Sequence, residues 1–153
     1  MEKIELDKVI HKELMQIEST AENKAEILNE LAQLLDEKGY IESAERFLKD
    51  VYLREEEGET GIGQGIAIPH GKSPAVKETT VAIATLKNEI EWETLDGKGV
   101  SVVIMFAVKD SDANTTHVLL LQKIAILLAN DCFIERLKTV ATVDELFELI
   151  TNS

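Results

Sequence analysis

The stretch VSVVIMFAV, residues 100–108, is the longest apolar run of the chain, and only Ser101 interrupts it. Its β-branched and apolar residues are typical of a strand buried on both faces, and VAIATL, residues 81–86, has the same character. Between the two, residues 90–92 are a candidate short strand and Asp96-Gly97 indicates a turn. We therefore expect a buried β-sheet at the centre of the fold.

A glycine-rich segment precedes these strands. Five glycines fall within residues 58–71, around short apolar pieces near Ile62 and Ile66. Glycine lets the backbone approach neighbouring groups closely, so we expect tight packing here. Short strands at the two isoleucines would favour a mixed sheet over a parallel one.

Two amphipathic helices are predicted before the glycine-rich segment. Ser19 and Glu22 have the spacing of a capping box that would start a helix over residues 20–38, and Gly39 can end it. A second helix is predicted over residues 42–56. The residues expected to face inward are Ile27, Leu28, Leu31, Leu34 and Leu35 on the first helix and Ala44, Phe47, Leu48, Val51 and Tyr52 on the second.

Helices return after the strands. They are predicted over residues 114–130 and 133–138, followed by a last helix with Thr142 as its cap and Glu145 three residues later. This order of elements predicts a single α/β domain over residues 1–153, a layered sandwich in which helices flank a mixed β-sheet.

The composition limits the function. With 16 Lys and Arg residues against 29 Asp and Glu residues, the net charge is −13, and no basic cluster stands out. Such a chain repels nucleic acid, favours partners with a basic face, and can handle phosphate only at a small, locally positive site. The single cysteine, Cys132, cannot form an internal disulfide and is expected to pack as a small apolar residue. This usage, with no signal peptide or membrane-length apolar run, predicts a cytoplasmic protein.

The three histidines differ in their surroundings. His11 lies among charged residues and is expected to be solvated. His70 follows Pro69, which stiffens the backbone, and precedes Gly71, which would leave room for a bulky group at the ring. Local sequence leaves three roles open for His70: nucleophile, metal ligand or turn residue.

His117 falls in the first turn of the predicted helix over residues 114–130. Leu120, Leu121, Ile124 and Leu128 follow at helical spacing, which places the ring on the packed face. Taken alone, this pattern favours a core histidine, although a helix start also attracts anions. A metal site is a weak alternative, because no further Cys, His or carboxylate motif accompanies the two histidines. The glycines do not form a nucleotide-binding motif.

The residues around His70 resemble a known signature. Glu55, then Ile62-Gly63, then residues 66–71 have the order and spacing of the phosphorylation site in the fructose/mannitol class of enzyme IIA. This class belongs to the bacterial phosphoenolpyruvate-dependent sugar phosphotransferase system. The resemblance extends from the first long helix to the last, and its details at residues 90–97 and 114–117 are most similar to the fructose-type branch.

The resemblance implies a phosphotransferase with a phosphohistidine intermediate. His70 would be the phosphorylated nucleophile, since a neutral imidazole offers a lone pair. Arg54 would offset charge on the phosphate oxygens, and His117 would hydrogen-bond to the phosphoryl group. Gly71 and Thr116 would complete a phosphate cradle. No cofactor, magnesium ion or nucleotide is required, because the donor is already a phosphohistidine.

The family also implies partners. The donor would be the small histidine-containing phosphocarrier protein. The acceptor would be enzyme IIB, through a cysteine in the fructose-type branch, in association with a membrane permease for sugar uptake. We expect Ile62, Ile66 and Ile68 either to form an apolar rim around His70 or to lie in the core. A regulatory phosphocarrier of the same fold, for nitrogen or potassium control, and a non-enzymatic metal-binding module stay open as alternatives.

Overall fold

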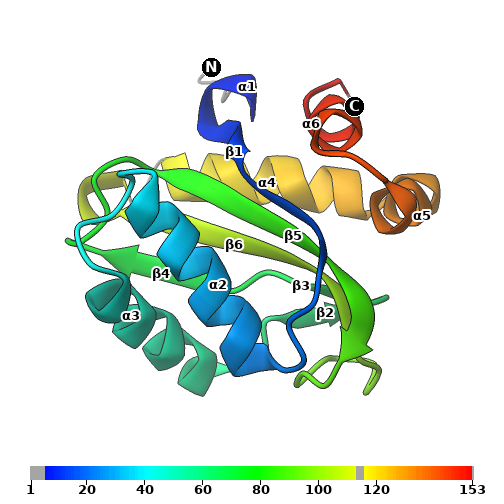
Figure 1. The fold of residues 1–153 in the computed structure, drawn as a ribbon, viewed down its shortest axis with the longest axis horizontal. Helices are drawn as coiled ribbons and strands as arrows, with labels where there is room; N and C mark the ends of the chain where they lie inside the picture. The colour runs from blue at the N-terminus through cyan, green and yellow to red at the C-terminus, as the bar shows by residue number, and fades with distance from the viewer. Residues whose placement is uncertain (1–5, 113–115, 153) are drawn as a thin grey trace.

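A six-stranded mixed sheet lies at the centre of the molecule (Figure 1). The computed structural model describes residues 6–112 and 116–152. The strands are β1 (Ile10–Ser19), β2 (Gly61–Gly63), β3 (Ile66–Ala67), β4 (His70–Ser73), β5 (Thr80–Ile90) and β6 (Val100–Lys109). They follow the order β1-β5-β6-β3-β2, and β4 also pairs with β6. The β5–β6 and β2–β3 pairs are antiparallel and the others parallel, which confirms the predicted mixed sheet.

Helices cover both faces of this sheet (Figure 1). On one face lie α2 (Lys24–Glu37) and α3 (Ala44–Glu57); on the other lie α4 (Thr116–Leu128), α5 (Asp131–Thr139) and α6 (Val143–Thr151) with the short α1 (Leu6–Val9). A 3-10 turn, η1 (Asp110–Asp112), follows β6. The alternate residues Val103, Met105 and Ala107 of β6 face α2 and α3, while Val102, Ile104 and Phe106 face the other layer. This two-sided burial explains why the central run is continuously apolar.

The start of the first helix is wrong in the sequence prediction. Helix α2 begins at Lys24, and its cap is Asn23, whose side chain accepts a hydrogen bond from the Glu26 amide. Ser19 is instead the last residue of β1. No strand is predicted over residues 10–19, because charged and apolar residues alternate irregularly there and the pairing with β5 contains register shifts.

Single residues also differ from expectation. Tyr52 is 41% exposed instead of facing the core, and Cys132 is exposed instead of packed. His11 is half-buried, with its ring stacked at 5.2 Å on Tyr40, so it is not a solvated residue. Trp92 is buried but follows β5 instead of forming a strand of its own. The predicted cap of the last helix is confirmed, because the Thr142 side chain accepts a hydrogen bond from the Glu145 amide.

Within the described residues, no single helix is both long enough and apolar enough to cross a membrane. The stretches His117–Leu128 and Asp131–Thr139 together meet the requirement by length and composition only, and they are bent by 93° at their junction.

Candidate phosphoryl-transfer site

His70 is the first residue of β4, where the chain rejoins β6 after leaving it at the end of β3. The backbone around it is anchored on both sides: the Ile68 amide donates to the Thr60 carbonyl at 2.9 Å, and the Pro69 carbonyl accepts from the Phe106 amide at 2.9 Å. In register, His70 pairs with Phe106. The His70 side chain is buried, and the residue is only 7% exposed. The stiff delivery of this imidazole that the sequence predicts is therefore present.

Gly71 serves a different packing purpose from the one expected. A Cβ atom at this position would lie 2.3 Å from Cε1 of Phe47 and 2.8 Å from Cγ2 of Val51, both on α3. The glycine therefore lets α3 approach β4 closely. Its part in a phosphate cradle stays a prediction.

His117 lies next to His70, although the two residues are far apart in the chain. Their ring centroids are 5.3 Å apart with an interplanar angle of 63°, and both rings also meet Phe106 edge-on. Nδ1 of His70 and Nε2 of His117 are buried without a hydrogen-bond partner among the described residues. Thr116 begins α4, but its side chain lies outside the described part of the structure, as do the whole of Asn114 and Thr115.

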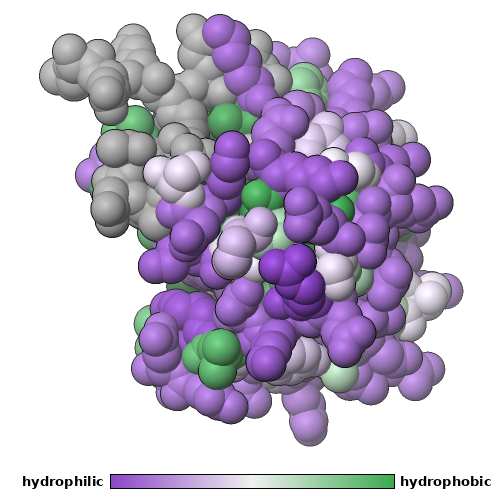
Figure 2. All heavy atoms as spheres, turned by 90° about the vertical axis from the view of Figure 1, so that its left-hand side faces the viewer, coloured by the Kyte–Doolittle hydropathy of each residue, from purple (hydrophilic) through white to green (hydrophobic). Residues whose placement is uncertain are grey.

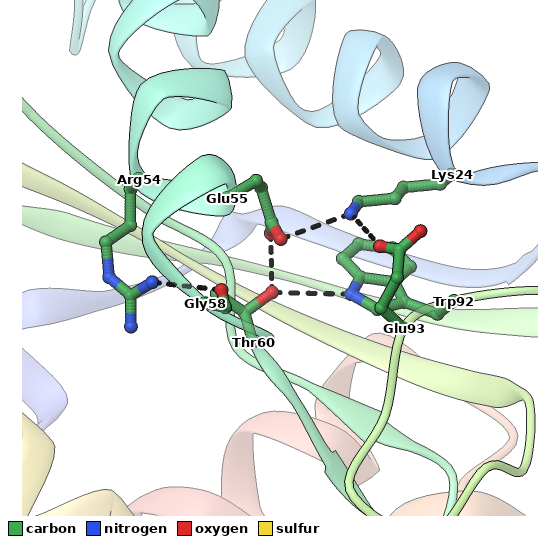
Figure 3. Close-up of polar contacts among 7 residues, drawn as sticks. All are labelled: Lys24, Arg54, Glu55, Gly58, Thr60, Trp92 and Glu93. Carbon is green, nitrogen blue, oxygen red and sulfur yellow. Dashed lines mark hydrogen bonds and ion pairs between the residues drawn. The ribbon is translucent and has the colours of Figure 1, made fainter.

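Arg54 lies in the last turn of α3 and reaches the same pocket. Its Nη1 donates a hydrogen bond to the Gly58 carbonyl at 3.2 Å, at the end of the helix (Figure 3). Arg54 as a whole is half-buried, and its cation is close enough to both imidazoles to lower their pKa. A cation here also complements the carbonyl end of the helix.

These groups line a pocket of about 310 Å³ that also contains Lys72. The remaining lining residues are Asp50, Leu53 and Glu57 from α3. Hollows of about 580 and 890 Å³ lie elsewhere, but neither has a histidine among the described residues that line it. The sequence reasoning missed Lys72. Its position two residues after His70 on a strand could have placed it on the same face.

The electrostatics of the pocket keep both imidazoles neutral. Burial, the neighbouring His117 and the Arg54 cation lower the pKa of His70 from 6.5 to about 4, although the Ile68 backbone acts in the opposite direction. Burial together with Lys72 and Arg54 also lowers the pKa of His117. At neutral pH the two neutral imidazoles offer lone pairs, and the adjacent Arg54 and Lys72 favour an anion, while Asp50 and Glu57 also line the pocket.

The comparison with protein-family models decides the family. Residues 8–153 match the family described as "Phosphoenolpyruvate-dependent sugar phosphotransferase system, EIIA 2". The chain belongs to this EIIA family. The resemblance noted from the signature around His70 is thus confirmed.

Relatives of this EIIA chain differ in their described roles. It is 36% identical over 148 residues to the PTS system 2-O-alpha-mannosyl-D-glycerate-specific EIIABC component of Escherichia coli, covering 96% of this chain but only 22% of that protein. Among solved structures, the nitrogen regulatory protein IIA-Ntr of Neisseria meningitidis matches with a TM-score of 0.86 and 27% identity, covering 94% and 97% of the two chains. A complex of Escherichia coli enzyme IIAMTL with phosphorylated IIBMTL shares the fold, with a TM-score of 0.78 at 23% identity over 92% of this chain and 96% of that one.

The surface beside the EIIA pocket is partly apolar. Ile66 is fully buried, so it belongs to the core, whereas Ile62 is 36% exposed and Ile68 half-buried. Leu53 and Val118, which the sequence reasoning did not place at the rim, are 52% and 46% exposed and are neighbours in sequence of Arg54 and His117. Figure 2 shows one end of the molecule, where hydrophilic residues predominate and hydrophobic ones form small separate patches.

A metal centre finds no support in the described residues, which contain no group of three or more His, Cys, Asp or Glu side chains placed to hold an ion. Asp50 and Glu57 line the pocket together with His70 and His117, but these side chains do not form a group placed to hold an ion. Two cations next to the imidazoles would oppose a positively charged metal ion.

Proposed function

We propose that this chain is a cytoplasmic phosphoryl carrier that accepts a phosphoryl group on His70 and passes it to enzyme IIB for coupled sugar uptake. The observation that carries the proposal is the pocket itself. The buried His70 and the half-buried His117, both neutral, lie next to Arg54 and Lys72, with Asp50 and Glu57 also in the lining, in a chain whose net charge is −13. A site of this kind attracts an anionic group at one point of an otherwise acidic surface.

The transfer needs positioning and charge compensation more than covalent assistance from the protein. The donor is the phosphohistidine of the histidine-containing phosphocarrier protein. Its N–P bond breaks as a new N–P bond forms to His70. The bonding electron pair stays on the donor nitrogen, which takes up a proton, and the His70 ring gives up the proton of its other nitrogen, so both rings end neutral. Because Nδ1 of His70 is buried, Nε2 is the nitrogen that we expect to attack.

The neighbouring residues then act on the phosphoryl oxygens. Arg54 supplies a planar, permanently charged donor, and Lys72 a second cation. His117 donates a hydrogen bond from its ring when the group moves on to the acceptor cysteine of enzyme IIB. Thr116 and the Gly71 amide are further donors of the cradle.

Two exposed apolar residues, Leu53 in the pocket lining and Val118 next to His117 in sequence, are suited to brief contact with both partners. Weak, fast exchange requires a small interface of this kind. We assign the chain to the fructose-type branch of transport EIIA proteins, acting with a membrane permease, on the resemblance of residues 90–97 and 114–117.

The test is incubation of the purified chain with phosphoenolpyruvate, enzyme I and the phosphocarrier protein, followed by intact mass. We expect one phosphate per chain on the wild type and none on His70→Ala. Absence of the adduct from the wild type would refute the proposal.

A regulatory phosphocarrier is the second candidate, because the nitrogen regulatory protein of Neisseria meningitidis matches nearly the whole fold. Both roles use the same phosphorylated histidine, so phosphorylation alone does not separate them. Onward transfer does: a transport component loses its phosphate to a cognate enzyme IIB, whereas a purely regulatory protein retains it.

A further inference from the structure

Glu55 follows Arg54 in α3, but its side chain points away from the pocket. In Figure 3 the Arg54 guanidinium extends toward Gly58, while the Glu55 carboxylate extends toward Thr60 and Lys24. Only 7% of the Glu55 side chain is exposed. A carboxylate buried to this extent is costly unless its oxygens are paired, so the groups around it decide what it can do.

Both oxygens of this carboxylate are used. Oε1 accepts a short hydrogen bond from the Thr60 hydroxyl, and Oε2 forms an ion pair of 3.1 Å with Nζ of Lys24. The Thr60 hydroxyl in turn accepts from Nε1 of Trp92 at 3.3 Å. Thr60 itself is 2% exposed. The donors and acceptors of this buried group therefore satisfy one another.

Thr60 connects this network to the nucleophile. Its carbonyl accepts the hydrogen bond from the Ile68 amide at 2.9 Å, and His70 follows two residues later. The next carbonyl, that of Pro69, is held by Phe106 of β6. The segment that delivers His70 is thus fixed at one end by the sheet and at the other by Thr60, whose side chain is fixed by Glu55.

Lys24 also forms an ion pair with a second carboxylate, that of Glu93. Glu93 can therefore serve as a control for Glu55. Its Nζ lies 2.6 Å from a carboxylate oxygen of Glu93 and 4.9 Å from the centre of the Trp92 ring. The Glu93 side chain is 68% exposed, against 7% for Glu55. An exposed ion pair contributes little, whereas removing one partner of a buried pair has a large effect.

We propose that Glu55 is a positioning residue for phosphoryl transfer: through Thr60 it fixes the Ile68–His70 segment relative to Arg54 on the same turn of α3. The inference rests on the proposed function of His70. A displacement of about 1 Å between a nucleophile and the groups that orient its substrate can reduce a rate roughly 100-fold. The pocket residues are then aligned by a network that never touches the phosphoryl group.

The test compares Glu55→Ala, Glu55→Gln and the control Glu93→Gln. Phosphoryl acceptance from the carrier and transfer to enzyme IIB are measured at a temperature where circular dichroism shows each variant folded, together with the NMR signals of the His70 ring. We expect Glu55→Ala to slow both half-reactions at least tenfold and to shift the His70 ring signals. Glu55→Gln, which keeps an oxygen for Thr60, should recover most of the rate, and Glu93→Gln should match the wild type.

Thr60→Val and Thr60→Ser keep the test decisive if Glu55→Ala does not fold. Loss of the hydroxyl in Thr60→Val should reproduce the slow transfer, and Thr60→Ser should restore it. A lowered thermal midpoint with wild-type rates and unchanged His70 signals in the folded variants would overturn the proposal. If the wild type itself takes no phosphate, the proposed function fails, while the His70 ring signals still report whether Glu55 fixes the ring.

Discussion

Arg54 and Glu55 are neighbours on α3, but their side chains lie in two regions that differ in whether buried polar groups have hydrogen-bond partners. Around Glu55 every buried side-chain group described above has a partner: Thr60 with Glu55 and Trp92, and Glu55 with Lys24. Around Arg54, both imidazoles keep a buried nitrogen without a partner among the described residues. Buried polar groups are normally satisfied, so unsatisfied ones call for an explanation. The contrast separates a region that fixes geometry from one that keeps its donors and acceptors available for a ligand.

The largest effect on phosphorylation should come from removing the nucleophile, His70, from the pocket around Arg54. His70→Ala should abolish the acid-labile, base-stable phosphoryl adduct, because neither Arg54 nor Lys72 can replace the imidazole. Intact mass after incubation with the complete phosphorylation system measures this. The same measurement on His11→Ala is the control, since His11 also has a buried, unpartnered Nε2 but packs on Tyr40 instead of lining the pocket. An adduct that persists on His70→Ala would show that another residue is phosphorylated.

The next largest effect should follow from removing the cation. Arg54→Ala should slow phosphoryl transfer by roughly 100-fold, the size of effect found when one group that stabilises developing charge is removed. Because the side chain is partly exposed and makes one hydrogen bond to Gly58, the loss of stability should be about 1 kcal/mol or less. Single-turnover kinetics and thermal unfolding on one preparation compare the two effects.

Arg54→Lys distinguishes planar donation from charge alone. It keeps the positive charge but not the forked arrangement of donors, so we expect only partial recovery of the rate. Full recovery by lysine would mean that Arg54 acts as a point charge. Losses of rate and stability that rise together across both variants would assign Arg54 to folding.

The continuous apolar run of β6 and the caps of the later helices are the parts of the fold that the sequence predicts well. Burial on both faces leaves an unmistakable run at residues 100–108, and Thr142 and Glu145 are local signals. Strand β1 is missed because its pairing is irregular, and no short-range pattern marks its residues as a strand. Local patterns predict elements whose burial is uniform and miss those that depend on a distant partner.

The residues of the candidate site also differ in whether the sequence predicts them. His70 is predicted through the spacing of the family signature, Arg54 and His117 through the wider resemblance to the family, and Lys72 could be found from strand alternation. The contact between His70 and His117, which the resemblance implies, is confirmed, but no local pattern predicts it, because it depends on how α4 packs on the sheet. The packing role of Gly71 is missed for a related reason, because its contact is with Phe47 of α3, far away in sequence.

The pH dependence of stability tests the environment of His70 without any partner protein. Burial, His117 and Arg54 lower the pKa of His70 to about 4, whereas the unfolded chain titrates near the ordinary value of 6.5. Between these values the unfolded state binds more protons than the folded state. The free energy of unfolding is therefore highest above pH 6.5 with respect to this group, and it decreases as the pH falls toward 4. At pH 5 the loss should be about 2 kcal/mol relative to pH 7. His70→Asn should not show this component when both proteins are unfolded by urea at the two pH values. Equal losses in the two proteins would mean that His70 titrates normally.

The smallest of these effects, and the one that separates the two half-reactions, concerns His117. Its ring faces His70 from the first turn of α4, and a hydrogen bond to the phosphoryl group matters most while the bond to His70 is breaking. His117→Ala should therefore accept phosphate from the carrier at nearly the wild-type rate and pass it to enzyme IIB roughly tenfold more slowly, a difference of about 1.4 kcal/mol in activation free energy. A core histidine without this role would behave differently: its replacement would lower the thermal midpoint and leave both half-reactions alike. His117→Gln, which keeps a hydrogen-bond donor, should recover part of the onward rate if donation is what counts. Equal slowing of both half-reactions in His117→Ala would instead group His117 with Glu55, as a residue that fixes the pocket and not one that contacts the moving group.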